Sequence, residues 1–385
     1  MTSSNISAAA FSDTKPHYHI LDGLRGVAAL MVIFYHIFEG FATSPIDQRF
    51  NHGYLAVDFF FVLSGFVVGY AYDDRWKKQM TKTNFFKRRL IRLHPMIVMG
   101  VVLGVITFLI QGSVKWDGSP VSMSMVMLAM LCTLFLIPAA PGTGAEVRGT
   151  GEMFPLNGPL WSLFFEYIGN ILYALILRRL STKALTVVVA LSAAGLAAFS
   201  IGNLSGFGNL GVGWTLADYN FLGGFLRLLF AFSVGLLMSR NFKPIKIRGA
   251  FWICSLAIIA LLSIPYIGGE ERMWMNGMYD AVCTIVIFPI LVYMGASGKT
   301  TGQASKRISQ FLGDISYPLY VVHYPFMYLF YAWLWSKEPS LTFSQTWHIA
   351  LILLIGNIVL AYLCLKFYDE PVRKYLTRRF LLKTK

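Results

Sequence analysis

The feature that most constrains this chain is a series of apolar runs, each about twenty residues long, that recurs along its length. A helix of about twenty apolar residues crosses the hydrocarbon core of a bilayer, which is roughly 30 Å thick. Lipid favours a helix because it satisfies every backbone N–H and C=O within the segment. Charged residues make up only 14% of the chain, whereas soluble domains carry about 25%. The sequence therefore predicts an all-α polytopic membrane protein.

The apolar runs predict one membrane domain with two short tails. The first twenty residues, MTSSNISAAAFSDTKPHYHI, lack the basic start and short apolar core of a signal peptide, so we expect the first run to be a retained span. The predicted boundaries are an N-terminal tail at 1–19, a transmembrane domain at 20–367 and a basic C-terminal tail at 368–385. The eleven apolar segments lie at 20–42, 52–72, 94–112, 121–140, 159–178, 184–202, 220–239, 250–267, 276–296, 312–334 and 346–367.

Basic residues between the runs predict the orientation. Lys and Arg gather in DDRWKKQMTKTNFFKRRLIR, RRLSTK, RNFKPIKIR, GKTTGQASKR and the C-terminal tail. By the positive-inside rule these clusters face the cytoplasm, so both termini are predicted to be cytoplasmic. Clusters on the same side of the membrane must be separated by an even number of crossings. Three segments, however, lie between the cluster that ends at 92 and the one that begins at 178. We expect 121–140 to lie along the outer interface or to re-enter, which leaves about ten transmembrane helices.

Several classes of function are excluded at this stage. The formal net charge of +14 is explained by the orientation clusters, and nothing in the chain suggests the basic folded surface that a nucleic-acid-binding protein uses. The four cysteines stand singly within apolar segments, without the spacing of a metal site, and are predicted to be buried small residues. No nucleic-acid partner and no metal are therefore expected.

Two ionisable residues lie within the first run, LDGLRGVAALMVIFYHIFEG. Arg25 and His36 are eleven residues apart, about three helical turns, so they share one helix face and differ in depth by roughly 16 Å. A charge at bilayer depth costs about 2.5 kcal/mol or more, which makes both residues functional candidates. The structural alternative is that Arg25 snorkels to the interface and His36 makes an interhelical hydrogen bond.

Three further polar residues are predicted near the depth of His36. Asp58, Glu166 and Arg227 each lie six or seven residues into a run from its outer side. One interpretation is a structural salt-bridge network, for example Glu166 with Arg227. The other is a polar reaction chamber in which the carboxylate of Asp58 or Glu166 orients His36 as a general base.

A cluster of arginines is predicted at the cytoplasmic end of the third run, FFKRRLIRLHP. Arg89 and Arg92 are three residues apart and share a helix face, and Arg88 lies beside them. The cluster is either an ordinary basic flank or an anion site, because arginine binds phosphates through two N–H groups at once. Arg25 is predicted at the same level.

The tenth crossing segment contains DISYPLYVVHYPF, in which Pro318 and Pro325 bracket His323. Proline frees backbone carbonyls of the preceding turn, and these need new partners or a cavity. His323 is predicted near mid-membrane, either as a packing feature or as a functional group.

These motifs together resemble the membrane acyltransferase 3 family. The resemblance rests on LDGLRGVAALMVIFYHIF, GYLAVDFFFVLSGFVVG, RRLIRLHP, PLWSLFFEYIGNILY, RLLFAFSVG, ISYPLYVVHYPF and YDEPVRKYL, in this order along nearly the whole chain. Many members have two adjacent acids followed by Gln-Phe-Tyr where this sequence has FFEYIGN.

The resemblance implies a ten-helix enzyme in the inner membrane of a bacterium. Such an enzyme moves an acyl group, often acetyl, from cytoplasmic acyl-CoA to a hydroxyl of a cell-envelope glycan or glycolipid. It implies that His36 is the catalytic histidine, that Arg25 is the arginine below it, and that Arg89 and Arg92 are the arginine pair of the donor side. Glu166 matches the family's acid.

The full set of candidate site residues follows from both arguments. The catalytic candidates are His36, Glu166 and Asp58; the candidates for acyl-CoA binding are Arg25, Arg89, Arg92 and Arg88; the candidates for acceptor binding are Arg227, His323 and Trp161. Trp161 and other tryptophans either stack on sugar faces or anchor at the interface. A transporter or flippase for a lipid-linked sugar or small anion is the alternative function, since buried charges and proline-broken helices also suit a transport pathway. Many transporters contain an internal repeat, and none is found here.

Overall fold

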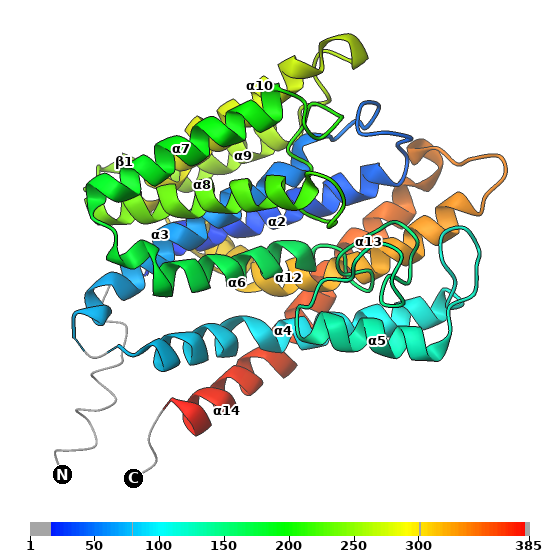
Figure 1. Cartoon of the computed structure of the whole chain (residues 1–385), viewed down its shortest axis with the longest axis horizontal. Helices are drawn as coiled ribbons and strands as arrows, with labels where there is room; N and C mark the ends of the chain where they lie inside the picture. The colour runs from blue at the N-terminus through cyan, green and yellow to red at the C-terminus, as the bar shows by residue number, and fades with distance from the viewer. Residues whose placement is uncertain (1–16, 79, 300–301, 382–385) are drawn as a thin grey trace.

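The computed structural model describes residues 17–381, apart from residues 79 and 300–301. Within this part the chain forms a bundle of helices with a single pair of two-residue strands (Figure 1). The elements, in order, are α2 His19–Glu39, η1 His52–Leu55, α3 Ala56–Trp76, α4 Lys82–Ile110, α5 Met123–Leu134, α6 Leu160–Leu175, η2 Leu177–Arg179, α7 Thr182–Ile201, α8 Asn220–Asn241, β1 Ile247–Arg248, α9 Ala250–Leu262, η3 Glu270–Arg272, α10 Met273–Val282, η4 Cys283–Ile287, α11 Phe288–Ser297, β2 Gly298–Lys299, α12 Gln303–Trp335, α13 Phe343–Cys364, η5 Leu365–Asp369 and α14 Glu370–Phe380.

Eight helical segments among the described residues are long and apolar enough to cross a membrane, which confirms the polytopic all-α fold. They are His19–Glu39, His52–Trp76, Lys82–Ile110, Leu160–Arg179, Thr182–Ile201, Asn220–Asn241, Glu270–Ser297 and Phe343–Phe380. The other two segments predicted to cross are occupied by α12 and by α9, and α9, with 13 residues, is shorter than a full span. The 33 residues of α12 are about 50 Å long, and many of them are buried against other helices. A central helix faces protein rather than lipid, so it tolerates more polar residues.

The helix α5 lies within the segment 121–140, which was predicted not to cross. It has 12 residues and is about 18 Å long, too short for a hydrocarbon core of about 30 Å. The chain then continues through an irregular segment, 135–159, before α6 begins. Non-helical backbone of this kind is tolerated at membrane depth only where it is buried in protein or lines a cavity.

One end of the bundle is basic, and we call it the basic end; the other is the distal end. The basic end carries the connection between α3 and α4, the strands and α14 (left in Figure 1). Strands β1 and β2 pair in parallel there, so α9 leads away from the basic end and α10–α11 returns to it. The predicted tail at 1–19 lies mostly outside the described residues, and the predicted tail at 368–385 is helical as far as Phe380.

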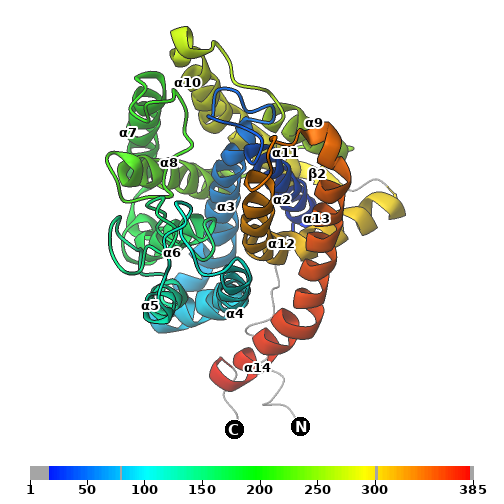
Figure 2. The ribbon, with the colours of Figure 1, turned by 90° about the vertical axis from the view of Figure 1, so that its right-hand side faces the viewer.

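Two parallel helix pairs form the centre of the bundle, α2 with α12 and α3 with α8 (Figure 2). Glycines allow the close approach. A Cβ atom on Gly26 would lie 2.3 Å from the carbonyl oxygen of Leu312, and one on Gly65 would lie 2.0 Å from that of Phe232. Small residues at such contacts are typical of membrane helices, because packing rather than the hydrophobic effect holds these helices together. The α2–α12 pair brings His36 beside His323.

Candidate active site

His36 lies in the last turn of α2, where Glu39 follows one turn later on the same helix face. The Nδ1 atom of His36 is 2.7 Å from Oε2 of Glu39. Tyr331 of α12 donates its hydroxyl hydrogen to the His36 carbonyl oxygen at 2.6 Å, and the same hydroxyl is 3.0 Å from Glu39 Oε2. The side chain of His36 is 14% exposed and that of Glu39 is 36% exposed, so both reach an open space. Two elements therefore fix one imidazole and its carboxylate.

That open space is a cavity of about 560 Å³ at the distal end of the bundle. His36 and Glu39 lie on its wall, which is also formed by the start of α6, by α12 and by the segments before α3 and α8. Aromatic side chains form much of the lining, among them Tyr35, Trp116, Trp214, Tyr324, Tyr328 and Trp335. The predicted acceptor-binding residues Trp161 and Arg227 also line it. A mostly apolar cavity with a few convergent polar groups is typical of a small-molecule site.

Asp58 pairs with Arg227 in the structure, and both side chains are fully buried. Arg227 Nε donates to Asp58 Oδ1 at 3.0 Å, and Nη2 donates to Oδ2 at 2.7 Å. Nη1 donates to the carbonyl oxygen of Val212, and Nη2 also donates to that of Tyr54.

The sequence left two alternatives open, a salt bridge such as Glu166 with Arg227, or a chamber in which Asp58 or Glu166 orients His36. The structure instead pairs Arg227 with Asp58 and His36 with Glu39. Which residues pair here depends on how α3 is rotated against α8, and the sequence of neither helix contains this information.

Glu166 pairs instead with Arg89, whose Nη2 atom lies 2.7 Å from Glu166 Oε1. Ser64 donates to the same oxygen at 3.0 Å. The two residues were predicted at different depths, Glu166 near His36 and Arg89 at the cytoplasmic end. The third run was predicted to begin at 94, but α4 begins at Lys82, so Arg89 already lies about 10 Å along this helix. Seven residues into α6 the chain has already reached the level of Arg89.

The predicted arginine cluster gathers at the basic end. Arg25 binds Asp22 on its own helix at 2.8 Å. Arg25, Arg89 and Arg373 lie close enough to Arg92 to repel its charge. Arg88 precedes Arg89 on α4. Arg373, which binds Asp369 at 3.0 Å, belongs to α14 and was not among the sequence candidates.

His323 is fully buried beside His36, with a distance of 5.5 Å between the ring centroids. It is not among the residues that line the cavity. The carbonyl freed by Pro325 is that of Val321, four residues earlier, and it accepts a hydrogen bond from Asn157 Nδ2 at 2.9 Å. The prediction that the prolines create a need for new partners is confirmed at this position.

Glu152 is a second carboxylate on the cavity wall and was missed in the sequence. It accepts hydrogen bonds from the hydroxyl of Tyr328 and, at 3.1 Å, from that of Thr150. The guanidinium of Arg148 lies 3.4 Å from the centre of the Tyr328 ring. Burial raises the pKa of Glu152 to about 7, and the nearby positive charge of Arg148 opposes this shift. The irregular segment before α6 gave no local pattern that could have identified Glu152.

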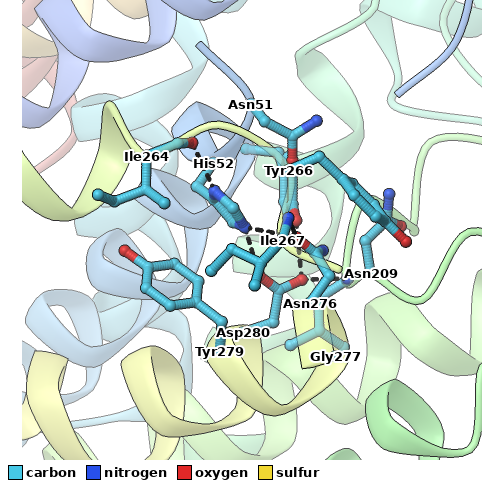
Figure 3. A network of polar contacts seen from close by, with 12 residues as sticks. Asn51, His52, Asn209, Ile264, Tyr266, Ile267, Asn276, Gly277, Tyr279 and Asp280 are labelled. Atoms are coloured by element: carbon cyan, nitrogen blue, oxygen red, sulfur yellow. Dashed lines mark hydrogen bonds and ion pairs between the residues drawn. The ribbon is translucent and has the colours of Figure 1, made fainter. Parts of the chain in front are cut away.

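A buried polar network joins η1 to α10 (Figure 3). His52 Nδ1 lies 2.7 Å from the carbonyl oxygen of Ile264, and Nε2 lies 3.0 Å from Asn276 Oδ1. Asp280 accepts hydrogen bonds from the Tyr54 hydroxyl at 2.8 Å and from the Leu210 N–H at 2.7 Å. Tyr54 lines the cavity, so Asp280 acts on the site by holding this wall in place.

The described residues contain no group of three His, Cys, Asp or Glu side chains arranged to hold a metal ion. The model of a protein family described as an acyltransferase domain matches residues 18–366. The chain belongs to the acyltransferase 3 family. It is therefore an acyltransferase, with a donor and an acceptor substrate. Of the two functions predicted from the sequence, this supports the acyltransferase over the transporter or flippase.

Relatives of this acyltransferase come from several bacteria. Protein 2 in the picA locus of Rhizobium radiobacter is 34% identical over 45% of this chain and 90% of its own length. A putative O-acetyltransferase of Staphylococcus aureus (strain COL) is 24% identical over 92% of this chain, which spans 57% of that relative. The acyltransferase MdmB of Streptomyces mycarofaciens is 26% identical over 93% of this chain and 92% of its own length. No solved structure matches.

Proposed function

We propose that this chain is an O-acyltransferase of a bacterial inner membrane. It transfers an acyl group, acetyl in our proposal, from cytoplasmic acyl-CoA to a hydroxyl of a cell-envelope glycan or glycolipid. The observation that carries the proposal is His36, bound to Glu39 through Nδ1 on the wall of a cavity large enough for a sugar-sized acceptor. The family and the O-acetyltransferases among its relatives support the same class of reaction.

The chemistry follows from the state of the His36 ring. Because Nδ1–H is donated to the Glu39 carboxylate, the lone pair of the neutral ring is on Nε2. In one route Nε2 takes the acceptor's hydroxyl proton while the oxygen attacks the thioester carbonyl; the C–S bond then breaks and the thiolate takes the proton from His36. In the other route Nε2 attacks the thioester carbonyl and the C–S bond breaks, which leaves an acyl-imidazole and the thiolate. The acceptor oxygen then attacks the acyl carbon, the C–N bond breaks and the thiolate takes the hydroxyl proton. Both routes use the Glu39 carboxylate to stabilise the positive ring.

On the donor side, the proposal places the phosphates of acyl-CoA at the basic end. By the positive-inside rule that end faces the cytoplasm, and so do both termini. Arg25 and Arg92 supply phosphate-binding guanidinium groups together with Arg88 and Arg89, and Glu166 holds Arg89 in place. Between this end and the cavity the side chains of α12 are buried, so donor binding must open a path for the pantetheine arm along α12.

On the acceptor side, the proposal assigns the aromatic wall to the faces of a sugar. Trp161 and the tyrosines of α12 offer flat apolar surfaces, and Glu152 offers acceptors for hydroxyl groups. Arg227 shapes this wall from behind, since its N–H groups bind Asp58 and the backbone. Asp58 thereby contributes to the site by neutralising Arg227.

The test compares purified protein in lipid nanodiscs with a His36→Ala variant. Wild-type protein should release free CoA from acetyl-CoA when a glycolipid acceptor is present, and His36→Ala should lose this activity while remaining folded. His348→Ala is the matched control, because His348 is exposed on α13. Mass spectrometry of envelope glycans from cells with each variant should show acyl esters for wild type and control only. Ester formation by His36→Ala would refute the proposal.

A further inference from the structure

A groove between α4 and α14 lies at the basic end, separate from the distal cavity that contains His36. It encloses about 390 Å³, within the range of about 300–1,000 Å³ that is typical of ligand pockets. Figure 1 shows α14 beside the first half of α4, running outward from the bundle towards the C terminus. The groove takes no part in the proposed transfer reaction.

Two apolar stripes form the walls of this groove. On α14 the stripe is Val372, Leu376 and Phe380, which recur every four residues and therefore share one helix face. On α4 it includes Ile91 and Pro95, which are also four residues apart. The rest of the α14 surface is strongly basic, and a helix that combines an apolar face with a basic one is typical of a membrane surface. The walls are thus suited to an acyl chain.

Positive side chains lie at the outer end of the groove. Lys87 lines it from the second turn of α4. Arg379, on the last turn of α14, follows Leu376 by three residues, which places it on the helix face that lines the groove. Both residues are exposed, and neither forms an ion pair with an acid among the described residues.

The acidic side chains beside the groove do not neutralise these two charges, because they already have partners. Glu370 binds Lys366 at 2.5 Å, and Asp369 binds Arg373 at 3.0 Å. The outer end of the groove therefore carries positive charge that an anion from outside the chain can neutralise.

Helical periodicity separates this site from the arginines assigned to the donor. At about 100° per residue, Ile91 lies about 40° from Lys87 around α4, whereas Arg89 and Arg92 lie about 160° and 140° from it. Arg89 faces α6, where it binds Glu166. An anion bound at Lys87 is therefore not one of the phosphates that the proposed function places on the opposite face of α4.

A phospholipid matches this order of groups, because it joins acyl chains to a phosphate. Basic pockets between helices at a membrane surface bind anionic head groups in this way. We propose that the groove is a binding site for one anionic phospholipid, whose acyl chain lies between Ile91 and Leu376 and whose phosphate binds Lys87 and Arg379. The site prefers phosphatidylglycerol to phosphatidylcholine, because a choline group would bring a further positive charge to two unpaired cations. The inference is independent of the proposed function.

The test measures lipid binding by native mass spectrometry of the full chain in detergent. The probes are dioleoyl phosphatidylglycerol and dioleoyl phosphatidylcholine, which have identical chains. We expect one molecule of phosphatidylglycerol to bind about tenfold or more tightly than phosphatidylcholine. Lys87→Ala with Arg379→Ala should remove this preference. The matched control is Lys374→Ala with Arg378→Ala, which removes the same charge from exposed positions about 160° around α14 from Leu376 and should keep the preference.

A second pair of variants tests the apolar walls. Leu376→Trp should fill the groove and weaken phosphatidylglycerol binding about tenfold, whereas Tyr375→Trp, at an exposed position, should leave it unchanged. Equal binding of the two lipids by wild type, or an equal loss in the two double alanine variants, would overturn the inference. Displacement of phosphatidylglycerol by one equivalent of acetyl-CoA would assign the groove to the donor and overturn it as well. If Leu376→Trp does not fold, the alanine variants decide, because they alter only exposed side chains.

Discussion

The contact between Glu39 and His36 gives the sharpest prediction about catalysis. Substituting Glu39 by glutamine keeps a hydrogen-bond acceptor for Nδ1 but removes the negative charge, and substituting it by alanine removes both. A hydrogen bond to a charged group contributes about 1.5–3 kcal/mol and a neutral one about 0.5–1.5 kcal/mol. Loss of the charge alone should therefore cost about 1–1.5 kcal/mol, and loss of the whole contact about 1.5–3 kcal/mol.

These energies convert to graded losses of rate. Because 1.36 kcal/mol is a factor of ten, kcat should fall about 5- to 10-fold in Glu39→Gln and about 10- to 150-fold in Glu39→Ala. The 36% exposure of Glu39 lets water screen the pair, which favours the lower ends of these ranges. The assay is the release of CoA from acetyl-CoA by protein in nanodiscs. Asp117→Asn, in an exposed loop, is the matched control. Rates within about twofold of wild type for both Glu39 variants would refute the orienting role of this carboxylate.

Three further predictions follow from the buried charges and from the cavity. Asp58→Asn should lower the stability of the fold by about 3–5 kcal/mol, because it leaves Arg227 charged and buried. The double variant Asp58→Leu with Arg227→Met should recover much of this loss. Thermal unfolding in detergent measures the stability of each variant. The pKa of Glu152 rises from about 4.5 to about 7 on folding, so its protonation stabilises the fold at low pH and this contribution disappears as the pH rises to 7. The Tm of Glu152→Gln relative to wild type should therefore increase from pH 5 to pH 8, and a constant difference would contradict the burial of this carboxylate. Glu39 and Glu152 are carboxylates on the cavity wall, whereas the charge of Arg227 is already neutralised by Asp58. Acyl transfer to methyl glucoside should therefore exceed transfer to the negatively charged methyl glucuronoside by about tenfold or more, as measured by mass spectrometry. Equal transfer to both would contradict this selection by charge.

The local geometry of single helices could be predicted from the sequence, and this includes part of the site. Arg25 and His36 share a face of α2 because helical periodicity depends only on spacing. The same argument could have identified Glu39, since it lies three residues after His36 within the same run. The family motifs pointed to His36 without help from the fold.

Pairing between helices could not be predicted in this way. Asp58, Glu166 and Arg227 were predicted at one depth, yet Asp58 binds Arg227 and Glu166 binds Arg89. Each pairing depends on how two helices rotate and slide against each other, and the Glu166–Arg89 pair depends also on the start of α4 at Lys82, well before the apolar run. Hydropathy reports where a run lies but contains no information on these rotations.

The sequence by itself determined that the chain is a helical membrane protein with a basic end, because lipid requires apolar helices and basic loops mark one side. Only the tertiary structure decided which charges neutralise one another and that His36 and Glu39 face an aromatic cavity. It also decided that the buried ring of His323 lies beside that of His36. The physical reason is that burial and hydrogen bonding depend on side chains far apart in the chain, and packing alone brings these together.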